Sequence, residues 1–365
     1  MSFSFDFSGE DIDESLDQNG NDVEMSNAEG QAVADHHEGE AGAAVVDVKQ
    51  HDFNELLSSL PDRLSYSLVT ITSPTGKTLV LPRRELFDIR VQLMSEADGE
   101  DDNDRTLADL ENSDLRTGVY EGGFKTWECS VDLASLLLDR GPRKDIDEIV
   151  KCDQVIELGA GTALPSLTLF AHCIRERIPQ SFTLADYNAS VLSLVTLPNL
   201  LLTWALHTTT TPEALVDPTS SLDNSGDLEL SPALLSAFTS SLAEIGIHLT
   251  FLSGPWSPAL SSLIPASAPE MGTLILASET IYSPASTSAF VTLLISLLSR
   301  VKMAKAIVAA KRVYFGVGGS VDALKVECAE RGAVAYEVEN SGVKGVDRGI
   351  EGGGVGRALV EVQMY

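Results

Sequence analysis

The sequence predicts an α/β fold built on one mostly parallel sheet that is covered by helices on both faces. Short apolar runs alternate with helical patterns through the second half of the chain, and a glycine-containing loop follows the first of these runs. The residues after the first ~50 are rich in Leu, Val, Ala and Ile, and about 310 such residues can bury one large core. We therefore expect one main domain.

The N-terminal residues are acidic and contain few aliphatic runs. Residues 1–50 carry thirteen Asp and Glu against one Lys. Such a segment buries too little apolar surface to offset the entropy lost on ordering. We therefore predict a disordered acidic tail over 1–52, a pre-domain over 53–120 and the main domain over 121–365, with a surface insert at 207–247.

The elements follow from local patterns along the chain. In the pre-domain, apolar runs split by the turn Ser73-Pro-Thr-Gly76 predict two strands, and residues 97–104 form an acidic, loop-like stretch. The insert is rich in Thr, Pro, Ser and Asp, which favours a surface excursion with one short helix. The last two apolar runs are joined by a Gly-rich loop and can pair as an antiparallel hairpin at the sheet edge. The predicted strands are 66–71, 78–81, 154–158, 181–185, 248–252, 272–277, 306–310, 335–338 and 357–363, and the predicted helices are 131–138, 165–177, 190–202, 284–299 and 320–331.

The net charge of −29 argues against general affinity for nucleic acid, because phosphate binding needs clustered Lys and Arg and no such cluster is present. The charge favours a basic partner, or it serves only solubility. No apolar run reaches the ~18 residues of a membrane span, and the N-terminus lacks a signal-peptide pattern. We expect a soluble intracellular protein without membrane or direct nucleic-acid contacts.

The cysteines and histidines do not suggest a metal site. The four cysteines lie far apart without a CxxC pair, and His172, His207 and His248 have no second ligand at a workable spacing. We therefore predict reduced cysteines and no metal.

The loop Glu157-Leu-Gly159-Ala-Gly161 follows an apolar strand and precedes a helix, which is the context that a nucleotide-binding loop requires. Glycines there let the backbone approach a ligand closely, and the helix offers free N–H groups. Leu164 occupies the third glycine position of a dinucleotide fingerprint. This departure disfavours NAD and favours the E/D-x-G-x-G loop of seven-strand methyltransferases.

Two further positions extend the predicted cofactor site. Asp186 ends the next strand, where an acid commonly accepts hydrogen bonds from ribose hydroxyls, although it could also cap the helix near Ser190. Trp256, in Ser253-Gly-Pro-Trp256 after the following strand, could lie against an adenine ring or simply anchor the loop.

Together with these motifs, three blocks carry a family resemblance. From about Leu115 to Tyr365 the chain resembles the histidine protein methyltransferases, the eukaryotic enzymes that methylate a histidine of a large-subunit ribosomal protein, L three. The resemblance implies S-adenosyl-L-methionine as cofactor and a Rossmann-like seven-strand methyltransferase sheet. The blocks are Gly122-Gly-Phe-Lys125-Thr-Trp127-Glu128-Cys129, Ser278-Glu279-Thr280-Ile281-Tyr282 and Lys311-Arg-Val-Tyr314-Phe315-Gly316.

The resemblance also implies roles for individual residues. The segment before the core closes over the cofactor, the glycine loop holds its methionine end, and the acid after the second strand holds its ribose. The residues after the fourth strand lie where the substrate enters. The implied cofactor-binding residues are Lys125, Trp127, Glu128, Glu157, Gly159, Gly161, Asp186, Tyr187, Asn188, Trp256 and Ser278, and the implied catalytic residues are Glu279 and Tyr282.

A neutral imidazole already offers a lone pair at cellular pH, so a strong base is not obligatory. Glu279 or Tyr282 could orient the ring by accepting its N–H, whereas Glu279 could instead cap the helix after Pro284 or bind backbone. Trp127 could be a core anchor and Lys125 a solvated loop charge. Lys311 and Tyr314 could line the substrate channel or only rim it.

Two other functions remain open on the sequence alone. The chain could be a protein-lysine methyltransferase of the same superfamily, although those enzymes usually show Asp-x-x-Tyr where this chain has Glu279-Thr-Ile-Tyr282. It could also act mainly by binding a ribosomal protein during assembly. The expected partner is a basic ribosomal protein, the expected state is a monomer, and the expected locations are cytoplasm and nucleus.

Overall fold

The computed structural model describes residues 46–96, 122–141, 144–146, 150, 152–208, 225–338 and 356–365. Most of the predicted tail, the acidic stretch at 97–104, the rest of the pre-domain to 120 and the centre of the insert lie outside the described residues.

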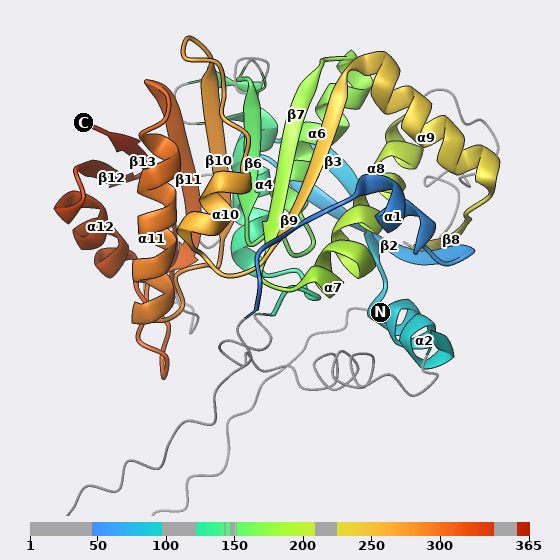
Figure 1. Cartoon of the computed structure of the whole chain (residues 1–365), viewed down its shortest axis with the longest axis horizontal. Coiled ribbons are helices and arrows are strands. Elements are labelled where there is room, and N and C mark those ends of the chain that lie inside the picture. Colours follow the sequence, from blue (N-terminus) through green and yellow to red (C-terminus); the bar gives the residue numbers. More distant parts are fainter. Residues whose placement is uncertain are drawn as a thin grey trace, which may run out of the picture. The chain divides into compact units, whose positions relative to one another are not determined.

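The main sheet has eight strands in the order β1-β9-β7-β6-β10-β11-β13-β12 (Figure 1). The five central strands are parallel, β13 runs antiparallel to β11, and β12 pairs with β13 at the edge. The predicted parallel sheet and its C-terminal antiparallel hairpin are confirmed. The strands are β6 (Gln154–Leu158), β7 (Gln180–Asp186), β9 (Ile247–Ser253), β10 (Gly272–Ser278), β11 (Met303–Lys311), β12 (Ala333–Glu337) and β13 (Arg357–Met364).

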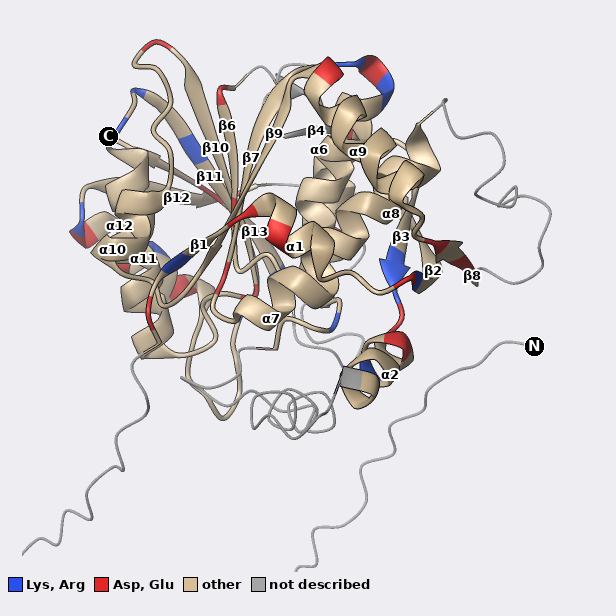
Figure 2. Ribbon diagram, turned by 45° about the vertical axis from the view of Figure 1, so that its right-hand side comes forward, with Lys and Arg blue, Asp and Glu red and all other residues tan. Residues whose placement is uncertain are grey.

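Helices cover both faces of this sheet because its strands are apolar on both sides. Successive side chains of a strand point to opposite faces. Val155 and Leu184 join the core under α4, α6 and α8, whereas Ile156 and Ala185 join the core under α10, α11 and α12. Figure 2 shows the strands of the sheet as mostly uncharged. The helices are α4 (Glu128–Asp139), α6 (Leu164–Glu176), α8 (Leu197–His207), α10 (Pro258–Leu263), α11 (Pro284–Leu298) and α12 (Val321–Glu330).

One continuous helix runs from Ala189 to His207. It comprises α7 (Ala189–Val191), a π-helical stretch η1 (Leu192–Thr196) and α8. Among the described residues, this 19-residue helix alone has the length and hydropathy of a membrane span, with a mean hydropathy of 1.6, but 78% of it is buried inside the fold. Its apolar composition therefore has a structural explanation as a core helix.

The boundary of the predicted tail needs a correction. Lys49–His51 form strand β1, which pairs antiparallel with β9, and His51 Nε2 lies 2.8 Å from Ser253 Oγ. Asp52 then caps α1 (Phe53–Ser58). Acidic composition suggested disorder up to residue 52, but this strand is stabilised by a partner some 200 residues away that no local pattern reveals.

The pre-domain and the insert form one structure. Strands β2 (Arg63–Thr72) and β3 (Thr78–Arg84) pair with each other, and β8 (Ser225–Glu229) of the insert adds to β2. The insert also contains α9 (Pro232–Ile245), whose buried Phe238 lies 5.3 Å from Trp204 between ring centroids. This differs from the predicted surface excursion with one short helix. The elements outside these layers are α2 (Leu86–Glu96) and the short pair β4 (Arg140–Gly141) and β5 (Lys144–Asp145).

Arg84 joins the pre-domain to the long helix. Its buried guanidinium donates to the Leu194 carbonyl at 2.9 Å and to Gln92 Oε1 at 2.7 Å. The Leu194 carbonyl lacks its usual partner four residues later because Pro198 has no N–H. The Arg84 backbone N–H donates to Asn199 Oδ1, so two bonds fix the end of β3 against this helix.

Candidate cofactor and substrate site

A cavity of about 430 Å³ opens at the carboxyl ends of β6, β7, β10 and β11, the edge where parallel α/β sheets commonly bind ligands. Most of the predicted site residues line it, and Lys311 and Tyr314 line it as well. Glu128 and Asn188 are not among the lining residues. The predicted residues in the lining are Lys125, Trp127, Glu157, Gly159, Gly161, Asp186, Tyr187, Trp256, Ser278, Glu279 and Tyr282.

The glycine loop requires its glycines for two reasons. Gly159 and Gly161 have φ of 72° and 50°, a region that favours glycine. A Cβ at Gly159 would lie 2.8 Å from Thr280 Cγ2, and one at Gly161 would lie 3.2 Å from the Gly123 carbonyl oxygen. The loop therefore passes close to the segments before α4 and after β10, and these segments form the walls of the cavity.

Glu157 is fully buried at the start of this loop. Its Oε2 accepts the Ser166 N–H at 3.0 Å, in the first turn of α6. Burial raises the pKa of Glu157 to about 8, and the nearby Asp186 adds to the rise while the Ser166 hydrogen bond opposes it. Glu157 therefore keeps its proton to a higher pH than an exposed glutamate does.

Asp186 is held by backbone donors on two segments. Its Oδ2 accepts the Gly161 N–H at 2.9 Å and its Oδ1 accepts the Asn188 N–H at 3.2 Å. The capping alternative fails, because Asn188 and not Asp186 occupies the N-cap position of α7. The carboxylate faces the cavity with a fixed orientation, as a ribose-binding acid would require.

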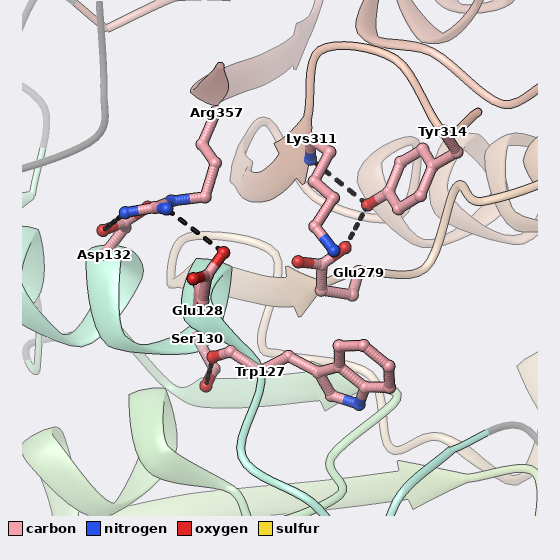
Figure 3. Close-up of polar contacts among 8 residues, drawn as sticks. All are labelled: Trp127, Glu128, Ser130, Asp132, Glu279, Lys311, Tyr314 and Arg357. Atoms are coloured by element: carbon pink, nitrogen blue, oxygen red, sulfur yellow. Dashed lines mark hydrogen bonds and ion pairs between the residues drawn. The ribbon is translucent and has the colours of Figure 1, made fainter. Parts of the chain in front are cut away.

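Two tryptophans form part of the cavity wall. Trp256 packs edge-on against Phe290 with ring centroids 6.3 Å apart, so it is both a loop anchor and a lining residue. Trp127 donates from Nε1 to the Gly122 carbonyl at 2.8 Å, and Lys311 Nζ lies 5.4 Å from the centroid of its ring (Figure 3). The structure therefore places Trp127 at the cavity rather than in the interior of the core.

Glu279 projects into the cavity from an unusual backbone conformation. Its φ is 58°, which is rare for a residue other than glycine. Its Oε2 accepts the Tyr314 hydroxyl at 2.5 Å (Figure 3). The predicted alternative, that Glu279 caps the next helix, is wrong, because Ser283 caps α11 with its side chain.

Three consecutive residues at the end of β10 and just beyond it present unsatisfied polar atoms. Ser278 Oγ, Glu279 Oε1 and Thr280 Oγ1 are buried and have no hydrogen-bond partner among the described residues. All three residues line the cavity. Because buried polar atoms are almost always paired, such a cluster indicates a ligand that supplies donors and acceptors here.

Glu128 and Asn188 do not contribute to the cavity as predicted. The Glu128 side chain is 69% exposed and lies 3.2 Å from Arg357 Nη1, while Arg357 Nε bonds Asp132 at 2.5 Å (Figure 3). This arrangement joins α4 to β13. Asn188 contributes its backbone N–H to Asp186. The sequence motif identified the two segments that line the cavity, but it did not show that the side chains of Glu128 and Asn188 lie outside the lining.

Other lining residues were not predicted. Gly123 lies against the loop, and a Cβ there would be 2.7 Å from both Cγ atoms of Val191. Ser130, at the start of α4, bonds the Trp127 carbonyl at 2.6 Å. The signal for Gly123 was present in the Gly122-Gly123 pair, but the close approach that requires it appears only in three dimensions.

The cavity fits the cofactor that the family resemblance implies. A glycine loop, a fixed acid at the end of β7 and an aromatic wall are the features that bind a nucleoside with a charged tail. The unsatisfied atoms at the carboxyl end of β10 leave hydrogen-bonding capacity for a second reactant in the same cavity.

Comparisons with curated proteins give clear relatives, although no protein-family profile matches this chain. Histidine protein methyltransferase 1 of Schizosaccharomyces pombe is 38% identical over 279 residues, which are 76% of this chain and 75% of that protein. Histidine protein methyltransferase 1 of Saccharomyces cerevisiae is 36% identical over 341 residues, 88% of this chain and 89% of that protein. The Rattus norvegicus homolog is 31% identical over 64% of this chain and 57% of its own length.

Solved structures give weaker matches. The mitomycin 7-O-methyltransferase MmcR matches 76% of this chain and 68% of its own at 10% identity and a TM-score of 0.34. An O-methyltransferase family protein from Burkholderia thailandensis matches 65% of this chain and 56% of its own, at 8% identity and a TM-score of 0.33. Similarity at this level says nothing about the substrate of this chain.

Proposed function

Because the chain belongs to the histidine protein methyltransferase family, we propose that it methylates an imidazole nitrogen of a histidine in large-subunit ribosomal protein L three. Its methyl donor is S-adenosyl-L-methionine. The observation that carries the proposal is the cavity at the ends of β6, β7 and β10, where the glycine loop lies beside the unpaired carboxylate oxygen of Glu279.

The bound cofactor supplies a methyl group activated on a sulfonium. The contribution of the protein is then mainly to position an attacking nitrogen in line with that group. A neutral imidazole has one nitrogen with a lone pair and one that carries a proton. A carboxylate oxygen that accepts the N–H leaves the other nitrogen to attack.

The position of Glu279 supports this role. Its Oε1 is buried at the cavity and lacks a partner among the described residues. Methyl transfer from the bound cofactor to the lone-pair nitrogen, with loss of the carbon–sulfur bond, would leave the ring cationic. The remaining N–H proton then leaves toward Glu279 or solvent and gives the neutral methylhistidine. Tyr282, 7% exposed and part of the lining, limits the space around the ring.

The surroundings of the cavity favour a protein substrate. In the loop between β11 and α12, which carries the lining residue Tyr314, the side chains of Val313, Phe315 and Val317 are exposed, with Phe315 exposed by 78%. Exposed apolar side chains that flank a cavity are typical of a surface that binds another macromolecule. The net charge of −29 favours encounter with a basic ribosomal protein.

The proposal is tested by incubating the purified chain with labelled S-adenosyl-L-methionine and large-subunit ribosomal proteins from cells that lack the enzyme. We expect the label on one histidine of protein L three. Label on lysine would instead support a lysine methyltransferase, and absence of label on any ribosomal protein would overturn the proposal. A Gly159→Val variant serves as the inactive control, because its side chain would meet Thr280.

A further inference from the structure

The arrangement of Glu279 depends on a second side chain. Tyr314 lies in the loop after β11, is 8% exposed, and donates its hydroxyl to Glu279 Oε2 at 2.5 Å. The same hydroxyl accepts the Lys311 backbone N–H at 3.3 Å. Burial and the Glu279 carboxylate raise the pKa of Tyr314, so its hydroxyl keeps the proton that it donates.

The loop that carries Tyr314 is fixed by backbone contacts. The Tyr314 N–H donates to the Gly319 carbonyl at 2.8 Å, and the Gly319 N–H donates to the Tyr282 carbonyl at 3.0 Å. A Cβ at Gly319 would lie only 2.0 Å from the Ile281 carbonyl oxygen. The loop after β11 therefore lies directly on the loop after β10, and Tyr314 reaches Glu279 from a rigid support.

The backbone of Glu279 is held from the other side. Its N–H donates to the Ala309 carbonyl at 2.9 Å, in a left-handed conformation that is unfavourable for a residue with a Cβ. Behind it, burial and the nearby Glu279 raise the pKa of the Cys129 thiol, so this neighbour is uncharged. With one carboxylate oxygen bound to Tyr314, the other oxygen has a fixed place at the cavity.

We propose that Tyr314 is a positioning residue that locks Glu279 so that Oε1 accepts the N–H of the target imidazole and thereby decides which ring nitrogen is methylated. This inference rests on the proposed function. Without the Tyr314 hydroxyl, the carboxylate rotates and either of its oxygens can meet the ring. Both ring orientations then become productive.

The test is the ratio of the two N-methylhistidine isomers formed on the ribosomal substrate, measured by mass spectrometry of hydrolysed product against both standards. We expect the wild-type chain to form one isomer predominantly. In Tyr314→Phe, the ratio of the major to the minor isomer should fall about tenfold. This change corresponds to ~1.4 kcal/mol in the free-energy difference between the two ring orientations. The turnover rate should fall while the affinity for S-adenosyl-L-methionine, measured by calorimetry, stays unchanged.

The chain offers a matched control. Tyr336 donates its hydroxyl to Glu361 Oε1, also at 2.5 Å, but between β12 and β13 and outside the cavity lining. Tyr336→Phe removes an equivalent hydrogen bond and should leave the isomer ratio at the wild-type value. A purely structural effect of losing a tyrosine hydroxyl would be seen in thermal unfolding of both variants.

The outcomes separate the two claims. A wild-type chain that leaves histidine unmethylated overturns the proposed function and this inference with it. A wild-type chain that methylates histidine, with a ratio that Tyr314→Phe does not change, overturns this inference alone. If Tyr314→Phe does not fold, the ratio is measured on Glu279→Gln. An unchanged ratio there would also overturn the inference, because Tyr314 acts through Glu279.

Discussion

The Asp186 carboxylate accepts the Gly161 backbone N–H at 2.9 Å, so one side chain joins the end of β7 to the glycine loop after β6. This acid lines the cavity and also fixes the glycine loop that lines it, and we predict that both bind the cofactor. Substitution of this residue should affect both tasks, and two substitutions can separate them.

Asp186→Asn keeps an oxygen for the Gly161 N–H but removes the charge, whereas Asp186→Ala removes both. We expect cofactor affinity to fall about 10-fold in Asp186→Asn and about 100-fold in Asp186→Ala, from charge-assisted hydrogen bonds of roughly 1.5–3 kcal/mol. Calorimetry with S-adenosyl-L-methionine measures this. Asp153→Asn is the control, because Asp153 bonds the Ala268 N–H outside the cavity lining. Equal affinities for all variants would exclude a cofactor role for Asp186.

The pKa of Glu157 predicts a pH-dependent stability of the ligand-free chain. Its folded pKa, about 8, lies above its ordinary value of 4.5, so the folded state holds a proton that the unfolded state releases in this range. The contribution of Glu157 to the free energy of unfolding therefore falls as the pH rises from about 4.5 to 8, and it is constant at higher pH.

Glu157→Gln cannot ionise and should lack this loss. The difference in unfolding free energy, variant minus wild type, should rise by on the order of a few kcal/mol between pH 5 and pH 8. Urea unfolding at several pH values measures it. A difference that does not change with pH would show that Glu157 is ionised throughout.

The pairing of strand β1 with β9 leads us to predict that the residues around β1 support cofactor binding. Gly254, at the start of the loop that carries Trp256, lies against Val48, where a Cβ at Gly254 would be 2.9 Å from Val48 Cα. Deletion of residues 1–52 removes this support and the Asp52 cap, and cofactor affinity should fall roughly tenfold because the loop loses preorganisation.

Deletion of residues 1–45 is the matched control for that truncation, since it keeps β1 and should bind the cofactor like the full chain. Calorimetry on both truncated chains gives the comparison. If the two bind equally well, β1 has no part in shaping the loop.

Arg84 lies outside the cavity lining, and we predict that its replacement strongly lowers the free energy of unfolding. Arg84→Met leaves the Leu194 carbonyl, Gln92 and Asp88 without their buried donor, and should destabilise the chain by about 3 kcal/mol. Denaturant unfolding measures this loss. Arg83→Met, at the neighbouring half-buried position, should stay within about 0.5 kcal/mol of wild type. Similar losses for both arginines would contradict the joining role of Arg84.

The sequence predicted the central sheet well because each strand there is a local apolar run. The predicted strand 154–158 matches β6, and the helix predicted at 284–299 matches α11 within one residue. The glycine loop and Asp186 were found because their chemistry is tied to a strand end. These patterns are local, so they can be recognised in the sequence without knowledge of the residues that they contact in the fold.

The missed features all depend on distant partners. Strand β1 requires Ser253, and β8 requires Ser65, whose hydroxyl bonds Asp227 across 162 positions in sequence. Glu128 was expected at the cofactor, but it pairs with Arg357 from the other end of the domain. Nothing in the neighbouring residues of these positions encodes the partner that decides their place.

The contribution of β8 to the pre-domain sheet has a consequence for synthesis. During translation, β2 and β3 leave the ribosome as a two-stranded hairpin, which is marginally stable alone. Their third strand follows only when Ser225–Glu229 is made, and the partner of β1 only when Ile247–Ser253 is made. Ser65 of β2 must therefore wait for its partner Asp227, which lies 162 positions later in the sequence. A nascent chain stalled before residue 225 should remain sensitive to protease through β2 and β3.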